Sequence, residues 1–85
     1  MTIQSGFLLS YLKYGDNDAI LHCFTKEKGF QSFFVKGIYA PKNKKKAYLH
    51  PLNELLFTIP EYGTKSNMPL VSKIDLKKEA NFILI

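Results

Sequence analysis

The sequence of 85 residues has few of the residues that cross-link small proteins or anchor them in membranes. Its one cysteine, Cys23, excludes a disulfide framework and a cysteine-rich zinc site within the chain. No apolar run approaches the ~20 residues that span a bilayer, and no secretory leader pattern opens the chain. We therefore expect a cytoplasmic protein that has no membrane partner, and a lone free thiol suits such a reducing compartment.

Arginine is also absent, because all twelve basic residues are lysine. Seven acidic residues leave a formal net charge of +5. Lysine is a point charge that suits phosphate, but it cannot make the bidentate contact with guanine that arginine makes. Any nucleic-acid binding by this chain is therefore expected to be largely independent of base sequence.

The patterns that mark catalytic centres are missing as well. No nucleophile-elbow sequence positions a serine, and no glycine-rich phosphate loop ends in Gly-Lys-Ser or Gly-Lys-Thr. Asp16 and Asp18 share a turn, but the other ligands of a calcium loop are absent. His22 and Cys23 point to opposite faces of an expected strand, so they cannot chelate one ion. We predict a protein that is not an enzyme, holds no metal and requires no cofactor.

The composition that remains is that of one globular domain. Apolar residues make up 46% of the chain, with five tyrosines and seven phenylalanines. A chain of this size buries about 60 to 65% of its unfolded surface. Residues 1–80 are expected to form the domain. Residues 81–85 are apolar and carry no turn or cap, so we expect them to begin a following segment at a truncated border.

Five segments have the alternation and the apolar content of β-strands, and they lie at residues 3–14, 19–25, 30–38, 52–59 and 68–76. In the first, Ile3, Phe7, Leu9 and Tyr11 alternate with small or polar residues and predict one buried face. Gly29 is expected to close a hairpin with a positive φ. The third segment has phenylalanines on both faces, so one is expected either to be exposed beside lysines or to be covered by the rest of a larger protein. Without a helical period, the five strands predict a small all-β barrel.

A cluster of lysines surrounds the connection between the third and fourth expected strands. It consists of Lys36, Lys42, Lys44, Lys45 and Lys46, and no acid occurs in residues 29–53. Like charges repel one another, so a core gains nothing from this cluster, whereas a polyanion releases counterions on binding it. Tyr39 and Tyr48 bracket the lysines and would offer rings on which bases can stack. These seven residues are our candidate nucleic-acid-binding residues, and the alternative is a loop that is merely solvated. Three more lysines in neighbouring turns could assist, namely Lys13, Lys26 and Lys28.

Five short segments appear in a familiar order and spacing, at residues 6–9, 14–18, 24–29, 35–37 and 49–52. They read Gly-Phe-Leu-Leu, Tyr-Gly-Asp-Asn-Asp, Phe-Thr-Lys-Glu-Lys-Gly, Val-Lys-Gly and Leu-His-Pro-Leu. In these segments the chain resembles the N-terminal domain of the bacterial DNA repair and recombination protein O (RecO) family. The resemblance spans most of the chain, and it is the order of the segments that carries it.

This resemblance implies a five-stranded OB-fold barrel with Greek-key connections, which binds single- and double-stranded DNA in recombinational repair. It also implies strand annealing, recombinase loading and two partners, recombination protein R and single-stranded DNA-binding protein. Lys36 would match the family's Lys-Gly pair, and Lys42 to Lys46 would occupy its basic loop. The chain departs from the family at His50, where glutamine is usual, and at Tyr39, where arginine is frequent.

Two other functions remain open on the sequence. One is a protein-interaction β-barrel module, whose lysines only solvate its surface. The other is an RNA-binding barrel of the translation machinery. Reversing the charge of the loop would separate DNA binding from protein docking, since an apolar interface depends little on rim charge. Competition between DNA and RNA would address the third function.

Overall fold

The computed structural model describes residues 2–60, 64–65 and 68–77. Within them lie β1 (Thr2–Tyr14), β2 (Asp18–Thr25), β3 (Gly29–Val35), the short 3-10 helix η1 (Lys45–Tyr48), β4 (Glu54–Ile59), β5 (Thr64–Lys65), β6 (Met68–Val71) and β7 (Lys73–Leu76). The predicted all-β class is confirmed. The segment predicted to follow the domain, residues 81–85, lies outside the described residues.

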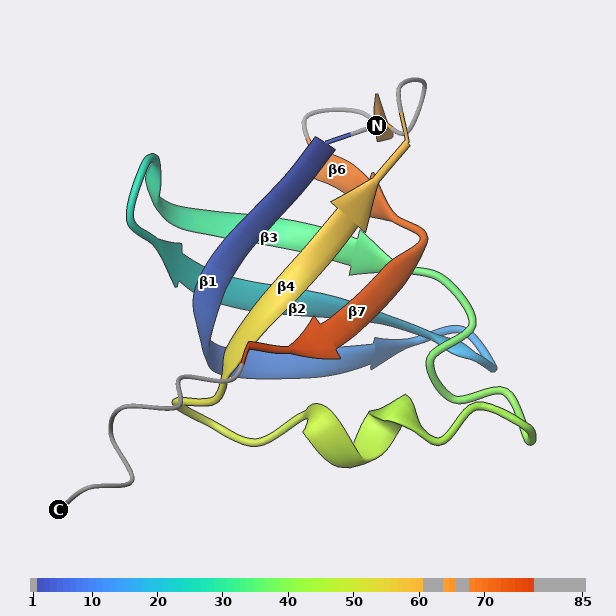
Figure 1. Ribbon diagram of the computed structural model, residues 1–85. Coiled ribbons are helices and arrows are strands. Elements are labelled where there is room, and N and C mark those ends of the chain that lie inside the picture. The colour runs from blue at the N-terminus through green and yellow to red at the C-terminus, as the bar shows by residue number, and fades with distance from the viewer. Residues whose placement is uncertain (1, 61–63, 66–67, 78–85) are drawn as a thin grey trace, which may run out of the picture.

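The strands form one curled sheet in the order β5-β6-β3-β2-β1-β4-β7 (Figure 1). The long strand β1 is shared, because its first half pairs with β4 and its second half with β2, both antiparallel. The pairing of β1 with β2 changes register at a bulge between Leu8 and Ser10. At the far side, β6 pairs with β3 in parallel, and β7 pairs with β4 antiparallel. The chain thus connects the two sides of the curled sheet through Ser72.

The described residues contain seven strands, and the predicted number of five is wrong. The last predicted strand divides at Ser72, whose backbone N–H donates to the Thr58 carbonyl at 2.9 Å. The Ser72 hydroxyl donates to the same carbonyl at 3.2 Å. At these bonds the chain stops pairing with β3, as β6, and begins to pair with β4, as β7. The last predicted strand therefore forms two strands. The two-residue strand β5 lies between the fourth and fifth predicted strand segments.

The interior of the sheet is filled by alternate residues of its strands. On β2, Leu21 and Cys23 are buried while His22 is exposed, so the opposite facing of His22 and Cys23 is confirmed. The Phe33 and Phe57 rings stack across the interior, with their centroids 4.3 Å apart and their planes at 18°. Burial raises the pKa of the Cys23 thiol to about 12. β2 lies between β3 and β1 in the sheet, and its two apolar faces differ in burial, because Leu21 and Cys23 are buried while Phe24 on the opposite face is 44% exposed.

The face of β1 that we predicted to be buried is in fact exposed. Ile3 is 64% exposed and Phe7 44%, whereas the buried positions are Gly6 and Leu8. A Cβ atom at Gly6 would lie 3.0 Å from the Thr25 Cγ2 atom, so the two strands approach closely there. The predicted alternation holds only up to Leu8, because the bulge between Leu8 and Ser10 shifts the later residues by one position, and side-chain size could not tell which face is inside. The larger residues lie outside, on what we call the outer face of β1, β2 and β3.

The hairpin between β2 and β3 forms as predicted. Gly29 has a φ of +70°, which an L side chain rarely adopts. The Thr25 hydroxyl accepts a hydrogen bond from the Lys28 N–H at 3.1 Å and donates one to the Gly29 carbonyl at 3.0 Å. The buried Thr25 hydroxyl therefore pairs with two backbone groups of the turn. These two hydrogen bonds hold the Thr25 side chain in one orientation.

Candidate nucleic-acid interface

The connection between β3 and β4, residues 36–53, is referred to below as the basic loop. It starts at a sharp turn, because Gly37 has a φ of +76° and its N–H donates to the Asp18 Oδ1 atom at 2.8 Å. Two apolar side chains fasten the loop to the core, with Ile38 1% and Leu49 5% exposed. The loop is thus held at both ends, although it has no regular strand.

Asn43 braces the middle of the basic loop. Its amide donates to the Gly37 carbonyl at 3.0 Å, and its Oδ1 atom accepts the Lys45 N–H at 2.8 Å. This second bond satisfies a backbone donor at the start of η1. Sequence reasoning missed both Asn43 and η1. The signal for them was an asparagine within a charged run, since its short side chain readily bonds to nearby backbone.

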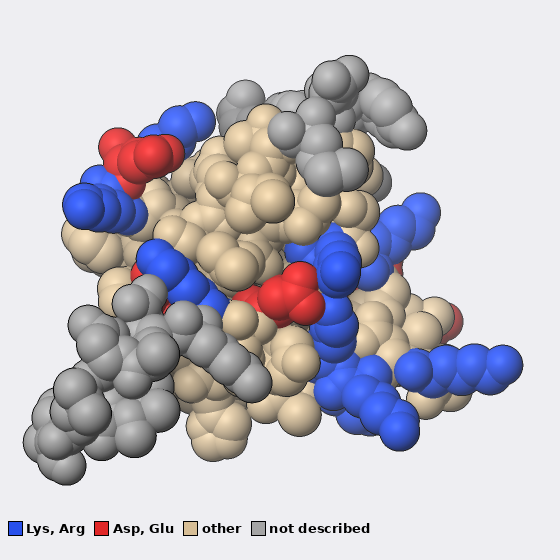
Figure 2. Space-filling model, in the orientation of Figure 1, with Lys and Arg blue, Asp and Glu red and all other residues tan. Residues whose placement is uncertain are grey.

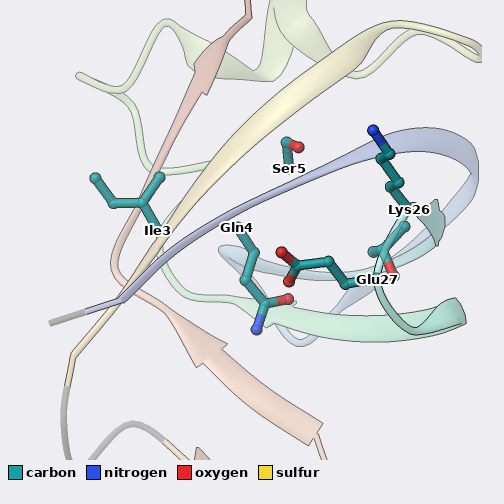
Figure 3. Close-up of a pocket in the computed structure, with 6 residues that line it drawn as sticks. Ile3, Gln4, Ser5, Lys26 and Glu27 are labelled. Carbon is teal, nitrogen blue, oxygen red and sulfur yellow. The ribbon is translucent and has the colours of Figure 1, made fainter.

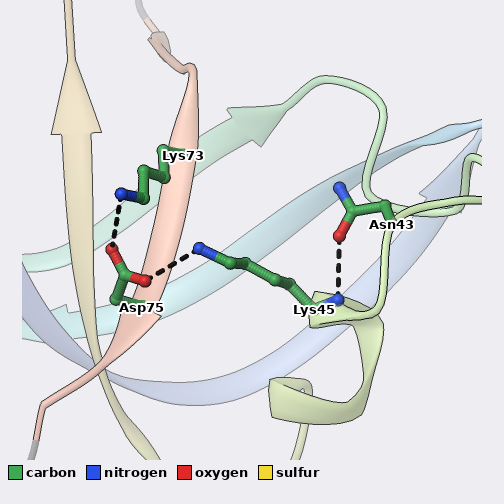
Figure 4. A network of polar contacts seen from close by, with 4 residues as sticks. All are labelled: Asn43, Lys45, Lys73 and Asp75. Atoms are coloured by element: carbon green, nitrogen blue, oxygen red, sulfur yellow. Dashed lines mark hydrogen bonds and ion pairs between the residues drawn. The ribbon is translucent and has the colours of Figure 1, made fainter.

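Lys45 is engaged in an ion pair within the protein (Figure 4). Its Nζ atom lies 2.8 Å from the Asp75 Oδ1 atom on β7, while the Lys73 Nζ atom lies 3.8 Å from Oδ2. The Lys45 side chain is only 31% exposed. The pair joins η1 to the last strand, so Lys45, one of the predicted phosphate contacts, also fixes the loop to the sheet.

The hydrogen bond from Lys45, with the charges of Lys45 and Lys73, lowers the pKa of Asp75 below its ordinary value of 3.8. A carboxyl whose pKa falls on folding stabilises the fold above its ordinary pKa, and that contribution is lost as the pH falls through the lowered value. We expect an NMR titration of Asp75 to have its midpoint below 3.8. Lys45→Met should raise that midpoint more than Lys73→Met does, because Lys45 also donates the hydrogen bond. Equal shifts in the two variants would contradict this assignment.

The other four predicted lysines, Lys36, Lys42, Lys44 and Lys46, are exposed. Among the described residues none of the four forms an ion pair with an acidic side chain. In Figure 2, lysine side chains project along the right-hand side of the molecule, and the acidic side chains in view lie mostly elsewhere. The positive charges of these four lysines are therefore directed to solvent, where they can attract an anion.

Both predicted tyrosines pack against the core and are half-buried. Burial, and then the neighbouring Tyr11, raises the pKa of Tyr39. The Lys13 Nζ atom lies 5.3 Å from the centroid of the Tyr39 ring, within the range of a cation–π contact. Tyr48 lines a shallow hollow together with the loop residues Gly37, Ala40, Lys42, Asn43, Lys44 and Lys45. The structure therefore brings Tyr48 and three of the predicted lysines to one concave surface.

A second hollow lies away from the basic loop, between the start of β1 and the turn after β2 (Figure 3). Its volume is about 130 Å³, and it is lined by Ile3, Gln4, Ser5, Thr25, Lys26 and Glu27. Ligand pockets usually enclose about 300 to 1,000 Å³. In the described part of the chain, no three His, Cys, Asp or Glu side chains are placed to hold a metal ion. None of the helical segments there has the length and apolar character of a membrane span.

Comparison with known families adds a finding from outside the geometry. Residues 1–79 match the sequence model of the family described as recombination protein O N terminal. The chain belongs to this family. The recombination protein O match covers all of the described residues and includes the basic loop, so the resemblance noted in the sequence is confirmed.

Two relatives of the chain are each described as DNA repair protein RecO, from Streptococcus thermophilus strains CNRZ 1066 and ATCC BAA-250 / LMG 18311. Each is 37% identical to the chain over 60 residues, which is 68% of this chain. The aligned part is 23% of the length of either relative. The chain thus corresponds to about a quarter of these recombination protein O relatives.

Proposed function

We propose that this domain binds DNA without sequence preference in recombinational repair, through the exposed lysines of the basic loop. The observation that carries the proposal is that four lysines of one loop face solvent without an acidic partner among the described residues. Membership of the recombination protein O family supports it, as does the description of two relatives as DNA repair proteins. The proposed role is a binding one in the cytoplasm, without catalysis and without a cofactor.

We assign the fold to the OB class, as the resemblance implied. Its support is the sharing of β1 between β2 and β4, together with the parallel pairing of β6 with β3, which is the plan of a partly open Greek-key barrel. The 3-10 helix η1 lies in the connection from β3 to β4. In this class, one face and the adjoining loops bind extended chains.

The mechanism that we propose is electrostatic. Each lysine that approaches a phosphate releases condensed counterions, so attraction depends on salt and not on base identity. Lysines placed between two strands offset the repulsion of their phosphates, and weak contacts let the strands search for their register. This mechanism supports strand annealing and recombinase loading, in concert with recombination protein R and single-stranded DNA-binding protein, the partners implied by the resemblance.

The test is fluorescence anisotropy of a labelled oligonucleotide over a salt series. If about four phosphates are neutralised, a fourfold increase in salt weakens single-strand binding roughly fiftyfold. Lys42→Gln, Lys44→Gln and Lys46→Gln should each reduce the slope of log affinity against log salt by about 0.7, and the three together by about 2.

Lys77→Gln is the matched control, because it removes the same charge from a lysine that pairs with Glu54 at 3.3 Å on the sheet. Its slope should equal that of the original protein. Binding that does not respond to salt or to the loop variants would contradict the proposal and favour a protein-docking module. Stronger competition by RNA than by DNA of equal length would favour an RNA-binding barrel.

A further inference from the structure

The outer face of β1, β2 and β3 carries a row of three phenylalanines. Phe24 is the direct cross-strand partner of Phe7 on one side and of Phe30 on the other. Phe30 is 80% exposed, and Phe7 and Phe24 are each 44% exposed. The rings of Phe24 and Phe30 meet edge to face with centroids 5.3 Å apart. Three neighbouring aromatic rings are thus exposed to solvent. A contiguous apolar patch of this kind usually marks a surface that binds a partner or a ligand.

A polar row lies beside the phenylalanines on the same face. His22 pairs with Ser10 on β1 and with Ser32 on β3, and the His22 Nδ1 atom lies 2.9 Å from the Ser32 hydroxyl. Beyond this row, Ile20 pairs with Leu12 and with Phe34. Apolar rows therefore alternate with a row of hydrogen-bonding groups, whereas the centre of a protein-docking surface is usually a continuous apolar patch.

The charge around the outer face is favourable to an anion. Among the described outward positions of β1, β2 and β3, the acidic side chain is Asp18 at the start of β2, and its Oδ1 atom accepts a hydrogen bond from the Gly37 N–H at 2.8 Å. Lys36, one of the proposed DNA contacts, follows β3 at one end of the face, and Lys26 and Lys28 flank Glu27 in the turn at the other. The eight residues of β2 span about 26 Å between these ends.

We infer that this face binds single-stranded nucleic acid by stacking unpaired bases on Phe24 and Phe30, and so selects single strands over duplex. The inference rests on the proposed function, because the basic loop supplies the attraction for phosphate that both forms share. Unpaired bases have open π faces that can stack on protein rings, whereas the bases of a duplex are already stacked on one another. Stacking on an aromatic side chain changes affinity by about tenfold to a hundredfold per base.

The experiment compares a labelled single strand of thymidine nucleotides with a labelled duplex of equal length, by anisotropy at one low salt concentration. Phe24→Leu with Phe30→Leu keeps apolar side chains in both strands but removes both rings. We expect single-strand binding to weaken by tenfold or more, with duplex binding unchanged within about twofold. Ile3→Ala is the control, because Ile3 is 64% exposed on β1 but lies four residues from the phenylalanine row.

Phe30→Trp provides a direct readout, since the chain has no tryptophan of its own. It should retain single-strand binding, and its fluorescence should be quenched by the single strand and not by the duplex. Unaltered fluorescence with both, or equal weakening of both in the leucine variant, would overturn the inference. If the salt-dependent binding of the basic loop persists in that case, the proposed function stands and only the stacking face is rejected. If the original protein binds neither form, the proposed function itself fails.

Discussion

Replacing Phe33 with alanine should lower the free energy of unfolding by about 3 to 5 kcal/mol. Phe33 is fully buried, and its ring stacks on that of Phe57 across the interior. The two rings belong to β3 and β4, which are not neighbours in the sheet, so their contact closes the curled sheet from within. A domain of this size has a total stability of only about 5 to 15 kcal/mol, so the variant should lose much of it.

Chemical denaturation with urea would measure this loss. Phe30→Ala makes the same chemical change on the same strand at a ring that is 80% exposed, and it should cost about 0.5 kcal/mol or little more. A similar loss in both variants would mean that the stacked pair contributes no more than a surface ring. Because β3 and β4 carry the two ends of the basic loop, Phe33→Ala should also weaken DNA binding at temperatures near its unfolding transition.

Replacing Gly6 with alanine should also be strongly destabilising, by about 1 to 3 kcal/mol. The new Cβ atom would lie 3.0 Å from the Thr25 Cγ2 atom and 3.3 Å from the Phe24 carbonyl oxygen. Thr25 cannot turn aside, because its hydroxyl is bonded to both Lys28 and Gly29 in the hairpin. The added methyl group must therefore separate β1 from β2.

A double-mutant cycle isolates the cause of this effect. Thr25→Ser removes the Cγ2 atom but keeps the hydroxyl, so Gly6→Ala should cost less in that background than in the original protein. Ser5→Ala, one residue along β1, is the control and should change stability little, since Ser5 is only half-buried. If Gly6→Ala costs the same with threonine or serine at position 25, the contact with Thr25 is not its cause.

Much of the fold followed from local patterns in the sequence. The strands were recognised because their alternation, aromatic content and bounding turns agree, as at Gly29, where a positive φ is required. These features depend on neighbouring residues, so they can be read without knowledge of the rest of the chain.

The features that could not be read depend on contacts between distant residues. The buried face of β1 is set by how closely Gly6 passes Thr25, which no alternation encodes. Ser72 divides the last predicted strand because it bonds to Thr58 on another strand. In the candidate site, five lysines appeared equivalent, but Asp75, thirty residues further along, engages Lys45. Only the folded structure therefore distinguishes the four exposed lysines from the one that is paired.

The burial of Cys23 has a practical consequence for labelling. A thiol with a pKa near 12 is present as thiolate in only about one molecule in 10⁵ at pH 7, and the thiolate is the form that reacts with maleimides. A second cysteine introduced at an exposed position would therefore react alone, without removal of the native one. Ala47 is exposed within η1 and carries no charge, so Ala47→Cys would place a dye among the lysines without removing any of them. Such a dye would report directly on the approach of DNA to the basic loop.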